Sequence, residues 1–453
     1  MRLAWFSPVP PVKSGIAGRT AELVNVLASR GHDIDVFVDE SVAHAARGVR
    51  SAHDFVWRHA QRPYDLNVYQ FGNSSHHDYE WPYAFRYPGL VVLHDTHLHH
   101  ARAALLLREH RAHDYRAEFA FAEPDANRDL AELAVNGFDS ALYYRWPLVR
   151  TLIATARLVA AHGGDAADEL RTHLTDAPAL ADRITTVTLG EGEAVSEARE
   201  AAARGRMRAR HGIPPDAVLF GVFGGLSPEK RIDQILDAFE AVLPAVPSAR
   251  LLLAGAPAAH YDVMAAVRAR AAGERVVTTG YVDSDDELTD YIAACDVTLN
   301  LRWPTARETS GPWLRALAAG RPTVTIDLLH LREVPSIDPR TWRPNQKQDP
   351  VCVAVDILDE EHSLRLAMRR LGADGVLRRS LGRAAAAWWS QEHSVARMAD
   401  DYERAMQQAR SRPAPSGEAL PPHLRDACAA TLRDVTRPFG AGVSERIREI
   451  SGG

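Results

Sequence analysis

Two loops in the second half of the sequence combine residues that suit the binding of a phosphorylated ligand. The first follows an apolar run at 218–223 and contains Gly224, Gly225, Lys230 and Arg231 ahead of an amphipathic stretch. Glycines allow close backbone approach, the start of a helix offers unpaired N–H groups, and the two cations add positive charge. The pattern therefore suits a diphosphate, with a solvated helix start as the alternative. It is not a Walker loop, because GxxxxGK(S/T) is absent.

The second loop, 300–311, joins an apolar run to another predicted helix. Thr309 or Ser310 can cap that helix, so the N–H groups at its start face the loop. Glu308 stands beside them and is an acceptor suited to sugar hydroxyls. Donors, a helix dipole and a carboxylate would then converge on one ligand. In the alternative interpretation Glu308 only complements the dipole and Arg315 is a surface cation.

Polar residues also follow predicted strands in the first half of the sequence. The loop 7–18 leads into a helix with Gly15 and Ile16 at its start, and Asn73 and His94 each follow an apolar run. In parallel sheets the carboxyl ends of the strands share one edge, where ligands bind. The alternatives are an ordinary Pro- and Gly-containing connection, a turn-forming Asn and a structural His.

Two stretches raise the question of a metal site. The run 94–100 contains four histidines and an aspartate, but nothing in it arranges three ligands. The triplet Asp283-Ser284-Asp285 precedes a predicted helix, and helix capping explains it. We therefore expect no metal and no cofactor.

The hydrophobic pattern predicts an α/β protein. Short β-branched and apolar runs alternate with amphipathic stretches, which is typical of parallel sheets covered by helices. The first half is expected to have strands at 3–6, 34–38, 66–69, 90–93, 158–161 and 184–189. The second half is expected to have strands at 218–223, 250–253, 276–278, 297–301, 323–326 and 351–355.

Two doubly wound sheets predict two domains with a ligand site between them. We expect an N-terminal domain at 1–192, with a helical insertion at about 96–148, and a C-terminal domain at 193–375. Helices at 376–412 are expected to pack back on the N-terminal domain, and 413–453 forms a tail. The insertion interleaves leucines 105–107 with arginines, a pattern that suits an anionic membrane surface or, as the favoured interpretation, an amphipathic core helix.

Composition excludes several classes of protein. The formal net charge of −6 provides no broad basic surface, so nucleic acid is not an expected partner. The three cysteines, Cys295, Cys352 and Cys428, are far apart and show no metal-ligand spacing, which fits a reducing cytoplasm. No apolar run approaches about 20 residues, so we expect no membrane span.

The motifs of the second half resemble those of retaining glycosyltransferases of family 4, or glycosyl transferases group 1, which have the GT-B fold. The resemblance rests on Gly-Gly-Leu-Ser-Pro-Glu-Lys-Arg at 224–231, Gly-Tyr-Val at 280–282, Ala-Cys-Asp-Val at 294–297 and the stretch 308–322. Their order and spacing are similar to the family's, and the resemblance extends over most of the chain. It implies two Rossmann-like doubly wound domains that face each other across a cleft.

The resemblance also implies roles for individual residues. The catalytic residues would be Lys230, Glu308 and His94. Lys230 would contact the donor diphosphate, Glu308 would contact the donor sugar, and His94 would line the transfer site. The other donor-binding residues would be Arg231, Gly225, Thr309, Ser310, Gly311 and Arg315. The loop that borders the acceptor and the phosphates would include Gly15, Ile16 and Asn73.

The sequence departs from the family pattern at two positions. Arg315 stands near the place of the second Glu of the E-x7-E motif, usually a ribose contact, with a spacing one residue shorter. Gly225 stands where the family often has an Arg, so Arg231 would provide the second phosphate cation. These departures suggest a variant branch with Glu-Thr-Ser-Gly at 308–311.

The resemblance implies retaining, metal-independent transfer of a sugar from a UDP- or GDP-type nucleotide sugar to a glycan, lipid-linked or small-molecule acceptor. Two alternatives remain: a degenerate nucleotide-sugar-binding protein, and a sugar-nucleotide epimerase on the same fold. A cytoplasmic location is expected, with peripheral contact at the inner face of the membrane as a further option.

Overall fold

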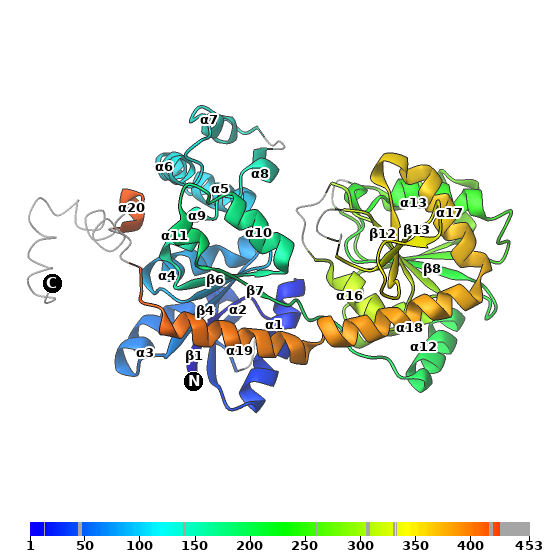
Figure 1. Ribbon diagram of the computed structural model, residues 1–453, viewed down its shortest axis with the longest axis horizontal. Helices are drawn as coiled ribbons and strands as arrows, with labels where there is room; N and C mark the ends of the chain where they lie inside the picture. The colour runs from blue at the N-terminus through cyan, green and yellow to red at the C-terminus, as the bar shows by residue number, and fades with distance from the viewer. Residues whose placement is uncertain are drawn as a thin grey trace, which may run out of the picture. The chain divides into compact units, whose positions relative to one another are not determined.

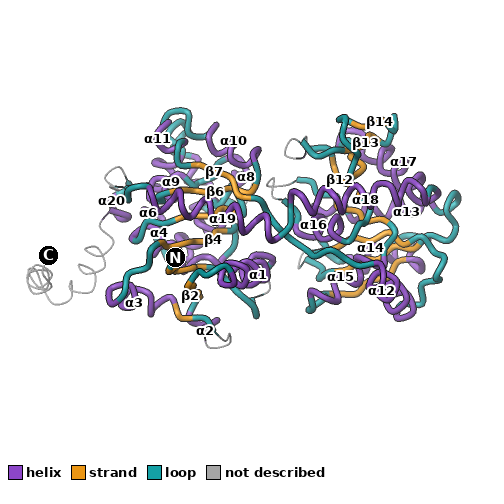
Figure 2. Tube along the Cα trace, turned by 60° about the horizontal axis from the view of Figure 1, so that its bottom comes forward, coloured by secondary structure: helices purple, strands orange, loops and turns teal. Residues whose placement is uncertain are grey.

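The computed structural model of the chain describes residues 1–12, 14–43, 48–138, 142–258, 261–304, 309–328, 331, 333–415 and 420–425. It divides into two compact units, Met1–Val187 with Tyr402–Gly453 and Thr188–Asp401. Each unit has one β-sheet with helices on both faces (Figures 1 and 2). The chain leaves the first unit after Val187, five residues before the predicted domain boundary at 192.

The sheet of the first unit is parallel throughout. Its strand order is β3-β2-β1-β4-β5-β6-β7, and its strands are β1 (Arg2–Phe6), β2 (Asp33–Val38), β3 (Arg50–Ser51), β4 (Leu66–Phe71), β5 (Leu90–Leu93), β6 (Leu158–His162) and β7 (Ile184–Val187). The central strands are apolar because helices bury both of their faces. All strands predicted for this half are present.

Helices cover both faces of this sheet. The covering helices are α1 (Gly15–Ser29), α2 (Glu40–Ala43), α3 (Phe55–Gln61), α4 (Trp81–Arg86), α9 (Arg150–Thr155), α10 (Gly164–Thr172) and α11 (Pro178–Ala181). The C-terminal part of α19 (Val395–Ser411) and the short α20 (Pro422–Arg425) also belong to this unit.

The predicted insertion is helical and has a core of its own. It consists of α5 (His99–Arg108), α6 (Ala112–Ala122), α7 (Leu130–Val135) and α8 (Leu142–Arg145), which lie together in Figure 1. Its core is formed by Ala103, Leu106, Tyr115, Phe119, Ala122, Ala131, Ala134 and Leu148. Arg102 is buried and donates from Nε to Glu118 Oε2 at 2.8 Å.

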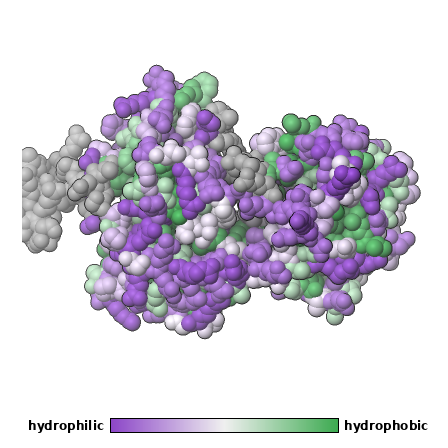
Figure 3. All heavy atoms as spheres, viewed as in Figure 1, coloured by the Kyte–Doolittle hydropathy of each residue, from purple (hydrophilic) through white to green (hydrophobic). Residues whose placement is uncertain are grey.

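The pattern that suggested a membrane surface belongs largely to this packing. Leu105 and Leu106 are buried, and Arg102 pairs with Glu118 inside the unit. Arg108 extends into solvent, where it pairs with Asp78, and the partly exposed Arg111 pairs with Glu109 and Asp114. Within the described residues, no helix has the length and apolar character needed to cross a bilayer. The visible face of both units is largely hydrophilic (Figure 3).

Glu123, the residue after α6, makes the stability of the first unit depend on pH. Its Oε1 accepts the backbone N–H of Leu148 at 3.1 Å, and burial raises its pKa from 4.5 to about 7. The unfolded carboxyl ionises above pH 4.5 while the folded one stays protonated to about pH 7. Glu123 therefore lowers stability progressively as the pH rises through this window, and the penalty stays constant above it.

The Glu123→Gln variant keeps the acceptor for Leu148 and removes the titration. We expect it to be more stable than the wild type by on the order of 1–3 kcal/mol at pH 8 and nearly equal to it at pH 4.5. Thermal unfolding at both pH values measures this. Glu109→Gln, an exposed position of the same insertion, serves as the control. An equal gain for Glu123→Gln at the two pH values contradicts the prediction.

The sheet of the second unit is parallel except at one edge. Its strand order is β10-β9-β8-β11-β12-β15-β13-β14, with β13 and β14 antiparallel. Its strands are β8 (Leu219–Phe223), β9 (Arg250–Ala254), β10 (Val276–Gly280), β11 (Val297–Asn300), β12 (Thr323–Ile326), β13 (Ser336–Asp338), β14 (Arg343–Pro344) and β15 (Cys352–Val355). The predicted strands are all present, and β13 and β14 are additional.

The helices of the second unit follow the predicted alternation with its strands. They are α12 (Glu197–Arg210), α13 (Ile232–Val242), α14 (Val263–Arg268), α15 (Asp285–Ala294), α16 (Gly311–Ala318), α17 (Glu360–Ala373) and α18 (Gly375–Glu392). Ser284 caps α15 by accepting the N–H of Glu287 at 3.3 Å. The capping interpretation of the Asp-Ser-Asp triplet is therefore confirmed.

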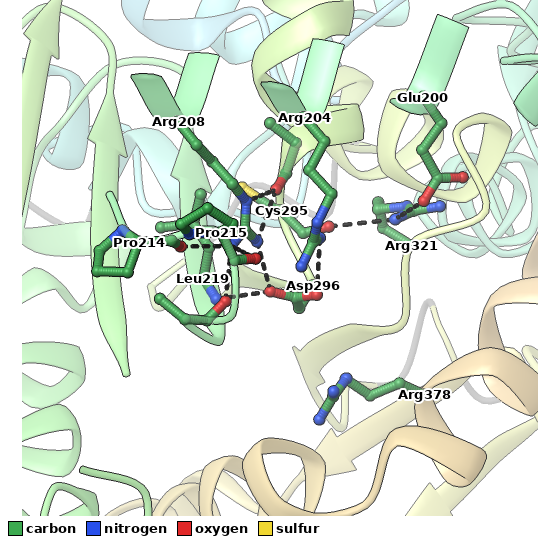
Figure 4. A network of polar contacts seen from close by, with 12 residues as sticks. Glu200, Arg204, Arg208, Pro214, Pro215, Leu219, Cys295, Asp296, Arg321 and Arg378 are labelled. Carbon is green, nitrogen blue, oxygen red and sulfur yellow. Dashed lines mark hydrogen bonds and ion pairs between the residues drawn. The ribbon is translucent and has the colours of Figure 1, made fainter. Parts of the chain in front are cut away.

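A buried carboxylate joins α12 to the sheet. Asp296 accepts the N–H of Leu219 at 2.8 Å, Arg208 at 2.7 Å and Arg204 at 2.9 Å (Figure 4). Burial raises the pKa of Asp296, but the Leu219 hydrogen bond and the two guanidinium groups outweigh it, and the pKa is lowered overall. The Arg-rich helix α12 is thereby fixed beside β8 and β11.

Helix α18 belongs to the second unit, whereas the sequence prediction placed 376–412 on the first domain. The indole N–H of Trp389 donates to the carbonyl of Glu191 at 2.8 Å, and Trp389 packs against α16 residues such as Trp313 and Leu317. Helix α19 passes from one unit to the other. From Tyr402 onward it belongs to the first unit, where Tyr402 stacks on Trp5 with ring centroids 5.7 Å apart.

Candidate functional site

In the second unit, the glycine turn after β8 brings backbone segments close together. Gly224 has a φ of +92°, a left-handed conformation that glycine adopts without strain. A Cβ on Gly255, after β9, would lie 1.9 Å from the Gly224 carbonyl oxygen. Gly225 has open space where a side chain would stand. The turn is therefore tight on the sheet side and open at Gly225.

Lys230 lies at the carboxyl end of β8. It ends the short 3-10 helix Pro228–Lys230, and its Nζ donates to the carbonyl of Phe223 at 2.7 Å. A Cβ on Gly224 would be 3.0 Å from Lys230 Nζ and 3.3 Å from Pro312 Cγ in the first turn of α16. The ammonium group and the start of α16 are therefore neighbours.

The start of α16 is capped as predicted. Ser310 Oγ accepts the N–H of Trp313 at 3.4 Å and donates to Asn300 Oδ1 at 2.9 Å, at the end of β11. Thr309 precedes the cap, and Gly311 is the first residue of the helix. The N-terminal end of a helix carries partial positive charge, so it adds to the field of the Lys230 ammonium group.

Arg231 has a partner inside its own unit. Its backbone is left-handed, with φ +58° and ψ +34°, and its Nε donates to Glu360 Oε1 at 2.8 Å. The hydrogen bond to Glu360 raises the pKa of Arg231. The guanidinium that the sequence assigned to a second phosphate contact is therefore paired with a carboxylate in this structure.

Arg315 is also held by carboxylates of the second unit. Its Nε donates to Glu191 Oε1 at 2.6 Å, and a second nitrogen lies 3.1 Å from Asp285 Oδ1. The Arg315 side chain is 12% exposed and that of Glu191 is 6% exposed. The position that resembles the second Glu of the family motif is thus part of an ion-pair cluster joining α16 to α15 and residue 191. Glu308 lies outside the described residues.

In the first unit, His94 is the centre of a polar network at the carboxyl ends of β4, β5 and β6. Its Nε2 lies 2.7 Å from Gln70 Oε1, and its Nδ1 lies 3.1 Å from His162 Nε2 and 3.3 Å from an Arg19 nitrogen. The hydroxyl of Tyr402 donates to the same Gln70 oxygen at 3.0 Å. The network thus joins three strands, α1 and α19.

The donors around His94 determine its tautomer. Arg19 is always protonated and can only donate, so Nδ1 of His94 accepts and Nε2 carries the proton that Gln70 accepts. Burial first, and then the neighbouring His162 and Arg19, lowers the pKa of His94 well below 6.5. His94 is therefore a neutral imidazole with a fixed orientation at physiological pH.

The N-terminal loop residues lie beside this network. Gly15 begins α1, and Ser14 caps it by accepting the N–H of Ala17 at 3.3 Å. Ile16 is packed closely against Gly72, since a Cβ on Gly72 would lie 2.5 Å from Cδ1 of Ile16. The start of α1 therefore lies against the end of β4, close to His94.

Asn73 has structural contacts. Its Oδ1 accepts the N–H of Ala101 at 2.9 Å in the first turn of α5, and its backbone N–H donates to Asp95 Oδ2 at 2.7 Å. It holds the insertion to the strand ends. The turn-forming alternative describes these contacts, and an acceptor contact of Asn73 stays a prediction.

Sequence reasoning missed Arg19, Gln70, His162 and Tyr402. His162 is the last residue of β6, and His94 directly follows β5. Because the register pairs Leu93 with Ala161, the two histidines are neighbours. Histidines at the ends of adjacent predicted strands could therefore have indicated this contact. Tyr402 lies 332 residues from Gln70, and no local pattern indicates that contact.

Residues 217–358 match the family model of glycosyl transferases group 1. This segment contains β8, Lys230, α16 and Arg315. A GDP-mannose-dependent alpha-(1-6)-phosphatidylinositol dimannoside mannosyltransferase from Mycobacterium tuberculosis is 30% identical over 193 residues, which cover 42% of this chain and 48% of that protein. The chain spans about half the length of the curated relatives it matches.

Solved structures resemble almost the whole chain. The catalytic domain of starch synthase IV from Arabidopsis thaliana bound to ADP and acarbose has a TM-score of 0.62 at 13% identity, covering 91% of this chain and 99% of that one. HepE from Anabaena in complex with UDP and glucose has a TM-score of 0.58 at 16% identity, covering 90% and 99%. The two Rossmann-like domains thus form a GT-B fold, as the sequence predicted.

Proposed function

We propose that the chain is a glycosyltransferase that transfers a sugar from a nucleotide diphosphate sugar to a hydroxyl acceptor, with retention of anomeric configuration. The observation that carries the proposal is the position of Lys230 Nζ beside the start of α16 at the carboxyl end of β8. Ligands of open α/β sheets bind at this edge. The group 1 match over 217–358 supports the same assignment.

The second unit would stabilise the leaving group. As the glycosidic bond breaks, negative charge develops on the departing diphosphate, and fixed positive groups lower the energy of that state. Lys230 and the N–H groups at the start of α16 supply this charge from the chain itself, so the proposal assigns no metal to the diphosphate. Because Glu360 pairs with Arg231, we give Arg231 a positioning role: it fixes the turn between Lys230 and α13.

The sugar and the acceptor would be held by the remaining predicted residues. By resemblance to the family, Glu308 would bind sugar hydroxyls, and the first unit would bind the acceptor near Gly15 and His94. The neutral imidazole of His94 is suited to hydrogen bonding and not to acid catalysis, because its pKa is far below physiological pH. In the retaining mechanism that we adopt, the leaving phosphate accepts the acceptor's proton.

The nucleotide is best identified by a thermal-shift screen. One relative is named as GDP-mannose-dependent, and the neighbouring structures contain ADP or UDP. We expect one of UDP, GDP and ADP, or its sugar conjugate, to raise the melting temperature by several degrees at 100 times its Kd, equivalent to about 2.7 kcal/mol. The corresponding nucleoside should give a much smaller shift. If no nucleotide or nucleotide sugar shifts the melting temperature, the proposed function is wrong.

A second candidate is a protein that binds nucleotide sugars without turnover. It is favoured by Arg315, which stands where the family has a ribose contact and is paired with Glu191. The two candidates differ in one measurement: the enzyme releases nucleoside diphosphate in the presence of acceptor, whereas the binding protein retains an intact donor.

A further inference from the structure

Three side chains of the first unit that can act as metal ligands, His97, Glu169 and His173, lie close together. His97 lies in the connection between β5 and α5, Glu169 lies on α10, and His173 is the residue that follows this helix. One ligand atom from each of the three lies within 4.8 Å of the others. The two imidazole rings are 6.3 Å apart at their centroids and nearly perpendicular.

Thr96 orients two of these side chains. Its hydroxyl donates to Glu169 Oε2 at 3.2 Å and therefore accepts from His97 Nδ1, which lies 3.1 Å away. A hydroxyl has one proton, so His97 must be protonated at Nδ1 and carry its lone pair at Nε2. A hydrogen bond of this kind from the second ring nitrogen orients most metal-binding histidines. Thr96 and His97 are both buried.

The donor set selects a class of cation. Two imidazoles and one carboxylate suit Zn²⁺ and similar transition metals, whereas Mg²⁺ and Ca²⁺ prefer oxygen ligands. Tetrahedral Zn²⁺ requires ligand atoms roughly 3.3 Å apart, given metal–ligand distances of about 2.0–2.2 Å. The ligand atoms lie up to 4.8 Å apart in the structure, so they must move closer together to bind the ion. Because His173 is exposed and Glu169 is half-buried, their side chains can move while His97 stays fixed.

We propose that His97, Glu169 and His173 bind one Zn²⁺-class ion, with a fourth position left to water. The ion fastens the connection after β5, which begins with His94 and Asp95, to α10. The ion would bind to these three residues whether or not the chain transfers a sugar. The sequence prediction did not combine His97 with Glu169 and His173, because these two lie more than 70 residues further along the chain.

Zinc titration of chelator-treated, tag-free protein tests the proposal. We expect one equivalent of Zn²⁺ to bind and to raise the melting temperature, and Mg²⁺ at the same concentration to have no effect. His173→Ala, at an exposed position, should fold normally and bind Zn²⁺ at least about 100-fold more weakly. His113→Ala removes an exposed histidine of α6 and should leave the affinity unchanged.

Thr96→Val tests the orienting hydrogen bonds. The substitution preserves side-chain shape and should weaken Zn²⁺ binding by about 10- to 100-fold. Co²⁺ substitution gives a second readout, a visible d–d absorption band in the wild type that disappears in His173→Ala. If the wild type binds no Zn²⁺, or if His173→Ala and Thr96→Val bind it as tightly as the wild type and His113→Ala, the site does not exist.

Discussion

The Lys230→Ala variant is expected to lower kcat/KM for sugar transfer by about 100- to 1,000-fold, the usual effect of removing one group that stabilises transition-state charge. Lys230 Nζ is held by the Phe223 carbonyl beside the start of α16. The substitution removes the hydrogen bond to the Phe223 carbonyl, and a hydrogen bond of this kind contributes about 0.5–1.5 kcal/mol to stability. The melting temperature should therefore change by only a few degrees.

Lys347→Ala provides the matched control. Lys347 belongs to the same unit and is exposed, so its removal changes the net charge by the same amount at a different place. We expect wild-type kinetics from this variant. Equal rates for Lys230→Ala and Lys347→Ala, or a loss of activity explained by unfolding of Lys230→Ala, would contradict the assignment of Lys230 to the diphosphate.

The Arg102→Met variant is expected to have the largest effect on stability, about 3–5 kcal/mol, because it leaves Glu118 buried without its main counter-charge. Burial raises the pKa of Glu118, but Arg102, followed by His423, lowers it to about 2 overall. The Arg102 guanidinium also lies over the Trp81 ring, 4.5 Å from its centroid. Methionine retains an apolar side chain and removes the guanidinium charge together with its hydrogen bonds to Glu118. Calorimetric unfolding measures the loss.

Arg108→Met is the control for this prediction. Arg108 is on the same helix, and its side chain is 59% exposed where it pairs with Asp78. Exposed ion pairs contribute about 0–1 kcal/mol, so this variant should unfold close to the wild type. If the two substitutions cost the same, the burial of the Arg102–Glu118 pair does not determine its contribution.

The sheets were predictable because their strands are buried on both faces and therefore read as continuous apolar runs. The exceptions are the short strands β3, β13 and β14, of which β13 lies between β15 and the edge strand β14. Strands β3 and β14 have two residues each, and β14 is exposed, so no hydrophobic run marks them. The glycine turn and the Ser310 cap were also predictable, because each depends on residues close together in sequence.

The partners of the cations were not predictable. Arg231 pairs with Glu360 at a separation of 129 residues, and Arg315 pairs with Glu191 at a separation of 124. Such contacts follow from the packing of α17 on α13 and of residue 191 on α16, and no local pattern encodes them. The helices at 376–412 show the same difficulty. Trp389 indicates that α18 has a buried face, but it does not indicate on which of the two units that face packs.

The most direct test of the central claim compares a nucleoside diphosphate with its nucleoside by calorimetric titration of the wild type and Lys230→Ala. If Lys230 and the start of α16 bind the diphosphate, the substitution should weaken the diphosphate by at least about 10-fold, or about 1.4 kcal/mol, and leave the nucleoside unchanged. Equal affinity of the two proteins for the nucleoside diphosphate, or equal losses for both ligands, would contradict the claim.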